Sequence, residues 1–298
     1  MLLRVSVYTR GAWLQPGRGG GEMATTTIDV EPVTPAVGAL IGGVDLREPL
    51  APDAVQAIRQ ALLDHGVVFF RGQDLTREQM RAFVVNFGTP IPEPLGGDRT
   101  MDPIGEGNMQ ATKRGTAVWH SDTTYVEHPP GLTALRAISV PPTGGDTCWG
   151  SMHAAYDALS APLRELLDGL TAVHSVEPVI ARMGLAAMVR AERSPDNAFE
   201  FTHPVVRVHP DTGRTALFVN EGWTTRIVEL SLAESAAILA LLFEHVKSPD
   251  FTMRWHWTDN ALALWDNRSV QHYAVPDYDA ARVMQRVVLA GERPVGPR

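Results

Sequence analysis

A histidine and an aspartate two residues apart are the first residues in this chain whose types and spacing suggest chemistry. His120 and Asp122 both lie in the short stretch Trp119–Asp122. Side chains alternate between the two faces of a strand, so positions i and i+2 point the same way. On a strand, the imidazole and the carboxylate of this pair can reach a single metal ion. A second histidine would complete the facial triad of non-haem Fe(II) oxygenases, which leaves coordination positions open.

The end of the chain offers a third ligand and two candidate anion-binding residues. His272 closely follows a turn-forming cluster, Trp265–Arg268. Arg282 and Arg286 lie further on, in an apolar segment that predicts the final strand. Four residues apart, they would share one face of that strand at a spacing of roughly 13 Å. Guanidinium groups that face inward are costly unless they meet anions, and arginine binds carboxylate or sulfonate oxygens through paired hydrogen bonds.

The segments that must position these residues are mostly predicted strands, with helices between and beside them. The predicted strands are 66–70, 132–140, 205–208, 215–219, 251–257, 261–265 and 282–289. The predicted helices are 52–65, 77 to about 87, 152–159, 162–170 and 232–246, the second and the last opened by capping boxes at Thr76 and Ser231. This order favours a mainly β fold with flanking helices, a β-sandwich or jelly roll. A Rossmann fold is excluded because no G-x-G-x-x-G follows a strand and opens a helix.

Three segments lack a clear periodic pattern. Residues 88–115 and 177–201 are long for loops in a compact domain, and such loops often cover a site. The first 22 residues are rich in glycine and lack the apolar core of a signal peptide. We expect residues 1–22 to be a disordered leader or the result of a misassigned start, with Met23 as the natural one, although a genuine flexible arm is the alternative. Residues 23–298 are predicted to form a single domain.

The composition narrows the class of protein. The chain has 298 residues, of which 44% are hydrophobic and 20% are charged, as in ordinary globular proteins. Its formal net charge of −8 argues against nucleic acid as a partner. No apolar run approaches the roughly 18 residues of a membrane span. The single cysteine, Cys148, excludes an internal disulfide and a cysteine-based zinc site, and it favours a cytoplasmic location.

Five stretches, taken together and in order, resemble the taurine dioxygenase family of Fe(II)- and 2-oxoglutarate-dependent oxygenases. They are Trp119–Asp122, Thr143–Thr147, Phe218–Gly222, Trp265–Tyr273 and Arg282–Arg286. The resemblance extends from Ile28 to Pro294. A single H-x-D is a weak signal, whereas the ordered set is specific.

The resemblance implies a double-stranded β-helix, which is a cupin-like jelly roll, and oxidation that depends on Fe(II), 2-oxoglutarate and O2. It implies that His120, Asp122 and His272 are the catalytic metal ligands. It assigns Thr147 and Arg282 to the far carboxylate of 2-oxoglutarate. The implied reaction converts 2-oxoglutarate to succinate and CO2 while a C–H bond of the substrate is hydroxylated.

The substrate end departs from the taurine-specific members of that family. The resemblance keeps Arg286 for the acidic group of the substrate. Glu93 stands where those members have a histidine, Thr116 replaces an asparagine and Trp223 replaces a phenylalanine. We therefore expect Glu93, Thr116 and Trp223 to contact a small acidic substrate other than taurine: another sulfonate, an alkyl sulfate ester or a carboxylate. A sulfonate or sulfate substrate would place the chain in sulfur metabolism, and core packing is the alternative role for Trp223.

Two other functions stay open. Zn(II) on the same ligands would give a hydrolase or lyase that works without O2 or 2-oxoglutarate. A chain that keeps the fold could also bind a small anion without catalysis, although the complete triad and the arginine pair argue against this. We expect a homo-oligomer, either a dimer or a tetramer, that binds neither nucleic acid nor a membrane.

Overall fold

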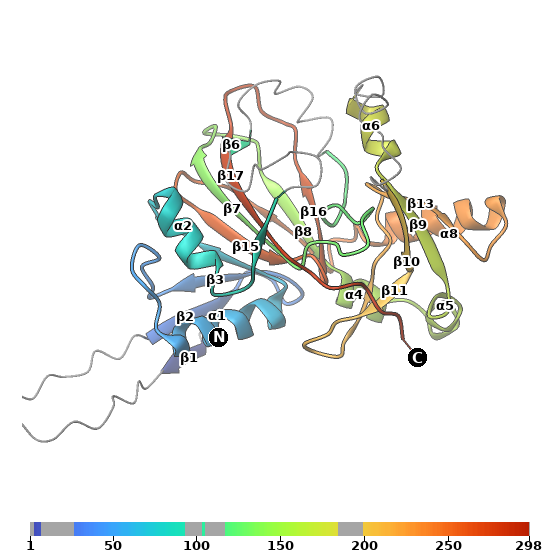
Figure 1. Cartoon of the computed structure of the whole chain (residues 1–298), viewed down its shortest axis with the longest axis horizontal. Helices are drawn as coiled ribbons and strands as arrows, with labels where there is room; N and C mark the ends of the chain where they lie inside the picture. The colour runs from blue at the N-terminus through green and yellow to red at the C-terminus, as the bar shows by residue number, and fades with distance from the viewer. Residues whose placement is uncertain (1–2, 7–26, 93–102, 105–116, 184–198, 298) are drawn as a thin grey trace, which may run out of the picture.

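The chain folds mainly into strands, with helices at the periphery (Figure 1). The structure is a computed structural model that describes residues 3–6, 27–92, 103–104, 117–183 and 199–297. The predicted mainly β fold class is confirmed. Within the described part of the chain, no helix has both the length and the apolar character needed to cross a bilayer.

The largest sheet has nine strands. They are β1 Leu3–Ser6, β2 Thr27–Pro32, β3 Ala39–Gly42, β4 Val67–Phe70, β5 Pro90–Ile91, β6 Pro103–Ile104, β7 Leu132–Ser139, β15 Leu262–Asp266 and β17 Val283–Leu289. Their order is β1-β2-β3-β4-β15-β7-β17-β5, and β6 also pairs with β17. The neighbours are antiparallel except β3 and β4, which are parallel. Strands close to both ends of the chain therefore lie in one sheet.

Three smaller sheets make up the rest of the β-structure in the described part of the chain. A three-stranded sheet has the order β14-β8-β16, with β8 Thr147–Ser151, β14 Thr252–Trp255 and β16 Val270–Ala274. Another has the order β10-β9-β13, with β9 Thr171–Ser175, β10 Glu200–Pro204 and β13 Thr224–Ile227. The last pairs β11 Val206–Val208 with β12 Thr215–Leu217.

A tryptophan-rich core lies between the large sheet and the β14-β8-β16 sheet. Phe69 of β4 stacks on Trp255 of β14 with ring centroids 4.0 Å apart. Trp149 of β8 meets Trp265 of β15 edge-on at 5.7 Å. Because strand side chains alternate, Val68 and Phe70 of β4 point to the opposite face of the large sheet from Phe69. That face is also buried, in a second cluster of apolar side chains. The large sheet is thus covered on both faces.

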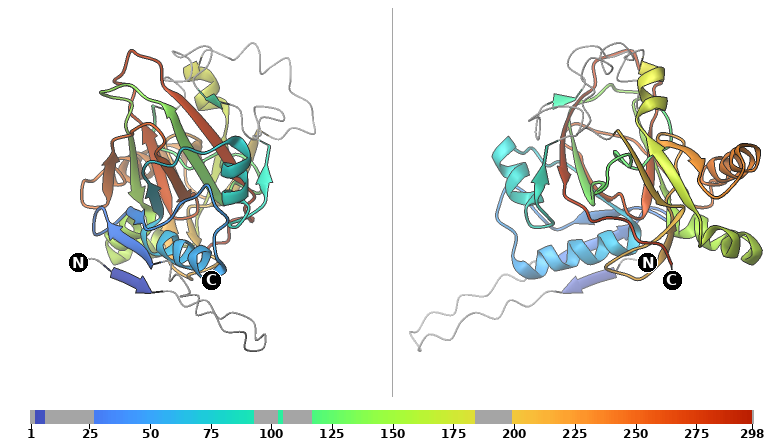
Figure 2. Two further views of the ribbon diagram at one scale, coloured as in Figure 1. Left: turned by 90° about the vertical axis from the view of Figure 1, so that its left-hand side faces the viewer. Right: turned by 45° about the vertical axis from the view of Figure 1, so that its right-hand side comes forward.

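Two helices cover that opposite face. They are α1 Pro52–His65 and α2 Arg77–Val84, drawn in blue and cyan in Figure 2. Ile58 and Leu62 of α1 and Met80 and Phe83 of α2 pack against β4 and β15. Complete burial of an aliphatic or aromatic side chain of this size stabilises the fold by about 1.5–3 kcal/mol.

The other helices lie beside the smaller sheets. They are α4 Met152–Asp157, α5 Ala161–Leu167, α6 Glu177–Met183 and α8 Leu232–His245. α8 packs on β13 and β9 through Leu239 and Leu242, on the side of the molecule away from α1 (Figure 2). The capping boxes predicted at Thr76 and Ser231 are both confirmed.

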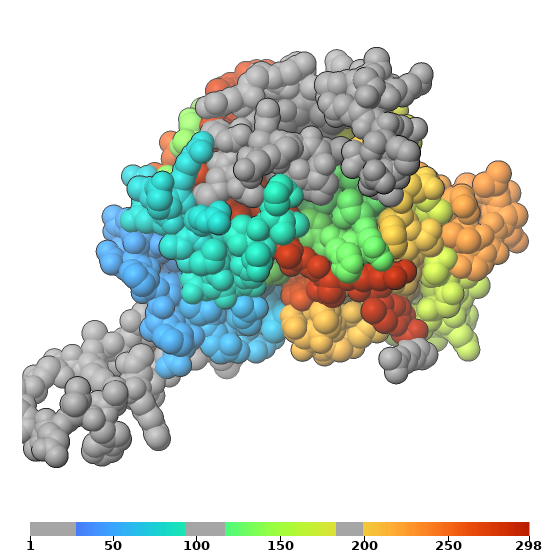
Figure 3. Space-filling model, in the orientation of Figure 1, coloured from blue at the N-terminus to red at the C-terminus, as the bar shows by residue number. Residues whose placement is uncertain are grey.

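The C-terminal segment anchors the segment that follows His120 and Asp122. On the face shown in Figure 3, residues after β17 (red) lie between the N-terminal elements (blue and cyan) and the segment that precedes β7 (green). Gly131 N donates to Leu289 O at 3.1 Å. A Cβ on Gly291 would lie only 2.1 Å from Pro129 O, so the two segments are in close backbone contact.

Several predicted bounds are wrong. α2 ends at Val84 rather than near residue 87, and α5 covers 161–167 rather than 162–170. The segment 177–201, predicted to be irregular, begins with α6 and ends in β10. The strands β9, β13 and β16 were not predicted at all, because they are short and carry histidine, threonine or arginine among their apolar residues. Residues 3–6 of the predicted leader form β1, which pairs with β2, so disorder is wrong for that stretch. Residues 1–2 and 7–26, most of 88–115 and residues 184–198 lie outside the described part, so the rest of the leader, the single domain and the covering loops stay predictions.

Candidate active site

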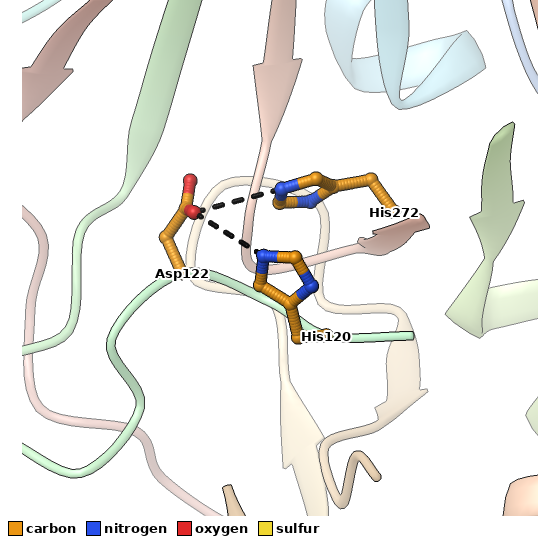
Figure 4. Close-up of side chains that lie close together, drawn as sticks. All are labelled: His120, Asp122 and His272. Carbon is orange, nitrogen blue, oxygen red and sulfur yellow. Dashed lines mark ion pairs between the residues drawn. The ribbon is translucent and has the colours of Figure 1, made fainter. Parts of the chain in front are cut away.

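Three potential metal ligands meet in the buried interior. His120 Nε2 lies 4.0 Å from Asp122 Oδ1, and His272 Nε2 lies 3.6 Å from the same oxygen (Figure 4). One ligand atom from each residue lies within 4.8 Å of the others, and all three residues are buried. Two imidazole nitrogens and one carboxylate are the donor set of a 2-His-1-carboxylate site. The residues that the structure brings together can therefore hold a divalent metal ion.

The strand geometry predicted for the first two of these residues is wrong. His120 forms one isolated antiparallel bridge with His272, with backbone hydrogen bonds of 3.0 and 2.8 Å in the two directions. Asp122 already lies in the turn that follows, where Thr123 has a φ of 42°. The bridge to β16, rather than alternation along a strand, sets the two imidazole rings 4.2 Å apart.

A hydrogen bond to His120 and the burial of both imidazoles suit these rings to a metal. His120 Nδ1 lies 2.7 Å from Val118 O. With its proton on Nδ1 donated to this carbonyl, the ring directs its Nε2 lone pair toward Asp122. Burial lowers the pKa of both His120 and His272. Both rings are therefore neutral at pH 7, and neutral imidazole is the form that binds a metal.

The carboxylate of Asp122 is held from behind by two buried side chains. Thr133 Oγ1 donates to Asp122 Oδ2 at 2.7 Å, and Asn267 Nδ2 donates to Thr133 Oγ1 at 2.9 Å. Asn267 Oδ1 also accepts from the backbone N of Asp122 at 3.2 Å. Burial by itself raises the pKa of Asp122, but the positive charge of Arg286 and the hydrogen bond from Thr133 help to bring that pKa below its usual range. The group is therefore an ionised carboxylate with Oδ1 directed at the histidines.

Arg286 reaches the metal end of the site from β17. Its Nη2 lies 2.6 Å from Asp122 Oδ1, and its side chain is only 18% exposed. The positive charge of Arg286 thus lies beside the three potential ligands. It contacts the same Asp122 oxygen that faces both histidines. A negative group that approaches this guanidinium is brought next to the metal-binding position.

Arg282 and Thr147 form the other end of the site. Arg282 Nε donates to Gly145 O at 2.9 Å, and its Nη2 lies 3.4 Å from Thr147 Oγ1. Burial lowers the pKa of Arg282, and among the described residues no carboxylate forms an ion pair with it. A buried cation without a counter-ion is unfavourable. This end of the site therefore fits an anionic ligand such as a carboxylate of 2-oxoglutarate.

The predicted common orientation of the two arginines is confirmed, but the predicted strand bound is wrong. Arg282 precedes β17, which begins at Val283. The pairing of β17 with β7 shifts between Val283 and Met284. Arg282 and Arg286 nevertheless both line the same cavity.

A single cavity of about 80 Å³ joins the two ends. Of the seven predicted site residues that the structure describes, all but Trp223 line it: His120, Asp122, Thr147, His272, Arg282 and Arg286. Leu135, Trp265 and Met284 from the large sheet supply apolar wall. Charged groups at both ends of an apolar cavity suit a small ligand that bridges the metal position and Arg282.

The remaining predicted substrate residues lie elsewhere or are not described. Trp223 is buried, donates from Nε1 to Ser121 O at 2.8 Å and meets the His120 ring edge-on at 6.2 Å. It packs beside the metal-binding turn and does not line the cavity. Glu93 and Thr116 lie outside the described residues, so substrate contact by all three stays a prediction.

Three residues that shape the site were not found from the sequence. Thr133 lies within an apolar run and gives no signal of a polar role. Asn267 belongs to the recognised stretch 265–273, which points to the region but not to its bond with Asp122. Tyr278, which lines the cavity near Arg282, lies in an irregular segment before β17.

Comparisons with known proteins agree with this geometry. The sequence model of the taurine catabolism dioxygenase TauD, TfdA family matches residues 29–288. The chain is 40% identical over 280 residues to an alpha-ketoglutarate-dependent sulfate ester dioxygenase of Pseudomonas putida, covering 90% of this chain and 91% of that protein. It is 38% identical over 287 residues to an alkylsulfatase of Acinetobacter baylyi, covering 91% and 88%. A crystal structure of a taurine dioxygenase from Burkholderia xenovorans is similar with a TM-score of 0.76 and 38% identity, covering 91% of each chain.

Proposed function

The chain belongs to the taurine catabolism dioxygenase TauD, TfdA family, and on that premise we propose that it hydroxylates an alkyl sulfate ester. It is an Fe(II)- and 2-oxoglutarate-dependent dioxygenase that acts on a small acidic substrate. The observation that carries the proposal is the meeting of His120, Asp122 and His272 with two arginines in one buried cavity. We also propose that the sheets form a double-stranded β-helix, which is supported by the packing of the β14-β8-β16 sheet on the large sheet.

His120, Asp122 and His272 would hold the iron. Their neutral imidazoles and ionised carboxylate suit Fe(II), and the three protein ligands leave positions for 2-oxoglutarate and O2. When bound, Fe(II) and 2-oxoglutarate activate O2, so that 2-oxoglutarate yields succinate and CO2 and an oxygen atom enters a C–H bond of the substrate. The chain itself contributes geometry and the exclusion of water.

Arg282 and Thr147 would bind the far carboxylate of 2-oxoglutarate. Thr147 Oγ1 accepts a hydrogen bond from Trp257 Nε1 at 2.9 Å, which leaves its own proton to donate to a carboxylate. Arg282 would add a charge-assisted hydrogen bond and gain the counter-ion that it lacks among the described residues. The two groups lie 3.4 Å apart, so one carboxylate can meet both.

Arg286 would bind the sulfate group of the substrate. A sulfate ester presents three terminal oxygens, and a guanidinium can bind two of them at once. Because the Nη2 of Arg286 lies 2.6 Å from Asp122 Oδ1, a sulfate held there brings the carbon of its ester bond toward the metal position. Hydroxylation of that carbon gives a product that loses the hydroxyl proton and the sulfate, leaving an aldehyde.

The preference for a sulfate ester over a sulfonate or a carboxylate rests on the relatives. The sulfate ester dioxygenase and the alkylsulfatase are 40% and 38% identical to this chain over nearly the whole length. The guanidinium of Arg286 is compatible with all three anions, so the substrate must be decided by experiment.

A coupled assay tests the proposal. The iron-loaded protein is incubated with 2-oxoglutarate, air and n-hexyl sulfate, and parallel samples receive n-hexanesulfonate, taurine or hexanoate. We expect equimolar succinate and sulfate from hexyl sulfate, at a higher kcat/KM than from the other three acids. Sulfate release without O2 and 2-oxoglutarate would instead identify a hydrolase. Faster succinate formation with hexanoate or a sulfonate would assign another substrate class.

We further propose a cytoplasmic homo-oligomer, a dimer or a tetramer. The single cysteine is compatible with a reducing compartment, where structural disulfides are rare. Light scattering of the purified protein measures the oligomeric state directly.

A further inference from the structure

The turn before β8 is in close contact with the segment 275–278. Gly144 and Gly145 both have positive φ, 76° and 70°. Gly145 N donates to Asp277 Oδ1 at 2.8 Å, and Val275 N donates to Asp146 O at 2.9 Å. A Cβ on Gly144 would lie only 2.4 Å from Asp277 O, so a larger residue would separate the two segments. The double glycine thus permits a contact between segments more than 100 residues apart in the chain.

Arg254 of β14 ties these two segments together. Its Nε donates to Asp146 Oδ2 at 2.6 Å, and its Nη2 donates to Asp277 Oδ2 at 2.8 Å. The Asp146 side chain is only 11% exposed, whereas those of Arg254 and Asp277 are about half exposed at 52% and 44%. One arginine and two aspartates therefore join three separate parts of the chain on the outside of the cavity.

The same turn holds the guanidinium inside the cavity. Gly145 N is bound to Asp277, and Gly145 O accepts from Arg282 Nε at 2.9 Å. A Cβ on Gly145 would lie 3.0 Å from Arg282 Cδ and 3.3 Å from Tyr278 Cδ1. The guanidinium carbon of Arg282 lies 6.0 Å from the centre of the Tyr278 ring. The position of Arg282 thus depends on where Gly145 is held.

We propose that Asp277, supported by Arg254, is a positioning residue for 2-oxoglutarate binding. Asp277 fixes the peptide of Gly145, and the carbonyl of Gly145 fixes Arg282. Neither Asp277 nor Arg254 lines the cavity, so both act on the ligand only through Arg282. Groups held in the bound geometry before the ligand arrives bind it more tightly, because less ordering remains to be done. The inference rests on the proposed function, since it takes 2-oxoglutarate as the ligand of Arg282.

A selective loss of 2-oxoglutarate affinity distinguishes positioning from general stabilisation. In the Fe(II)-loaded protein under anaerobic conditions, calorimetric titration measures the Kd of 2-oxoglutarate. For Asp277→Ala we expect this Kd to rise about fivefold to tenfold, the effect of one lost hydrogen bond to a positioned group. The iron content and the KM for the acidic substrate should stay within about twofold of wild type.

Two variants sharpen the test. Asp277→Asn keeps an oxygen that can accept from Gly145 N, so its 2-oxoglutarate Kd should rise by less than about threefold. Asp45→Ala is the matched control, because Asp45 forms a 2.6 Å ion pair with Arg47 at similar exposure, 43% and 57%, away from the cavity. It should leave the Kd for 2-oxoglutarate unchanged.

The inference is overturned if folded Asp277→Ala binds 2-oxoglutarate as wild type does, or loses affinity equally for 2-oxoglutarate and substrate. If Asp277→Ala does not fold, Arg254→Met decides, because it removes the cation and keeps an aliphatic stem. A 2-oxoglutarate Kd raised about threefold supports the inference, and a wild-type Kd overturns it. Failure of the wild-type protein to bind 2-oxoglutarate would contradict the proposed function instead.

Discussion

The two ends of the cavity differ in where their charges are balanced. At the metal end, Asp122 is buried together with Arg286 and two histidines, and Thr133 holds its second oxygen. At the other end, Arg282 meets a carbonyl and a hydroxyl but, among the described residues, no carboxylate. The metal end thus contains its own anion and can accept a cation, whereas the other end can accept an anion. The charges that a site leaves unbalanced indicate the charge of its ligand.

The largest expected effect is at the metal end. His120→Ala removes one of three metal ligands and should lower the rate of substrate-coupled succinate formation by at least about a thousandfold. This loss is small beside the total rate acceleration of a typical enzyme. Metal analysis of the purified variant should show a matching loss of bound iron. His128→Ala, at an exposed position on the same segment, is the control and should keep full activity. Full activity of His120→Ala in a metal-checked sample would refute the ligand assignment.

A buried ion cluster supports the metal end, and its loss should mainly reduce stability. Asp266, next to Asn267, accepts from Arg268 Nη2 at 2.7 Å and from His209 Nε2 at 3.0 Å. Asp266→Asn should lower the free energy of unfolding by about 3 kcal/mol or more, since it leaves Arg268 without its buried partner. Asp211→Asn removes a 48% exposed partner of the same arginine and should cost less than about 1 kcal/mol. Equal losses in urea unfolding would contradict a special role for the buried cluster.

The contribution of Asp266 to the free energy of unfolding should also depend on pH. Burial by itself raises the pKa of Asp266, but His209 and Arg268 bring that pKa below its usual range. A depressed pKa stabilises the folded state above the unfolded pKa of about 3.9, and the effect is lost as the pH falls through the lower folded value. The difference in stability between wild type and Asp266→Asn should therefore be full at pH 7 and shrink below about pH 4.

Substitutions of the two arginines should affect the KM values of different ligands. Arg286→Ala should raise the KM for the acidic substrate about 30-fold or more, because a buried charge contact of this kind contributes about 2 kcal/mol or more. Arg282→Ala should raise the KM for 2-oxoglutarate by a similar factor. Each variant is the control for the other, measured with both ligands varied in turn. Equal effects of one variant on both KM values would mean that the two arginines do not divide the ligands as proposed.

A smaller effect on metal binding is expected from Thr133, which holds the metal ligand Asp122. Thr133→Val keeps the shape of the side chain but removes the hydrogen bond to Asp122 Oδ2. The affinity for Fe(II) should fall about tenfold, as is typical when a partner of a metal ligand is removed. Thr225→Val, which removes an exposed hydroxyl bonded to Val173 O, should leave Fe(II) affinity unchanged in the same titration. If Thr133→Val binds Fe(II) with wild-type affinity, Asp122 is positioned without this hydrogen bond.

The sequence predicted the residues of the metal end better than their geometry. The ordered stretches located His120, Asp122 and His272, and capping boxes located the starts of α2 and α8. Yet Asp122 lies in a turn, and the strand that carries His272 was not predicted. Spacing along the chain reports local alternation, whereas the bridge between His120 and His272 joins residues 152 positions apart.

At the other end of the cavity, the sequence predicted which residues bind the ligand but not the contacts that hold those residues in place. Arg282 and Thr147 were named, but the shift in register before Met284 and the ties through Gly145 involve β7, β14 and the segment 275–278. Such contacts depend on how distant segments pack, and single residue types give no sign of them. Thr133 illustrates the same limit, because a threonine in a strand is most often there for its β-branched shape.

Visible absorption of the protein with Fe(II) and 2-oxoglutarate under anaerobic conditions tests the assignment of the cavity most directly. Fe(II) is added first, its binding is verified by metal analysis, and 2-oxoglutarate is then titrated. We expect a weak charge-transfer band that saturates at one 2-oxoglutarate per iron and is lost in His120→Ala. Absence of this band in wild-type protein that holds one iron per chain would contradict the assignment of this cavity to Fe(II) and 2-oxoglutarate.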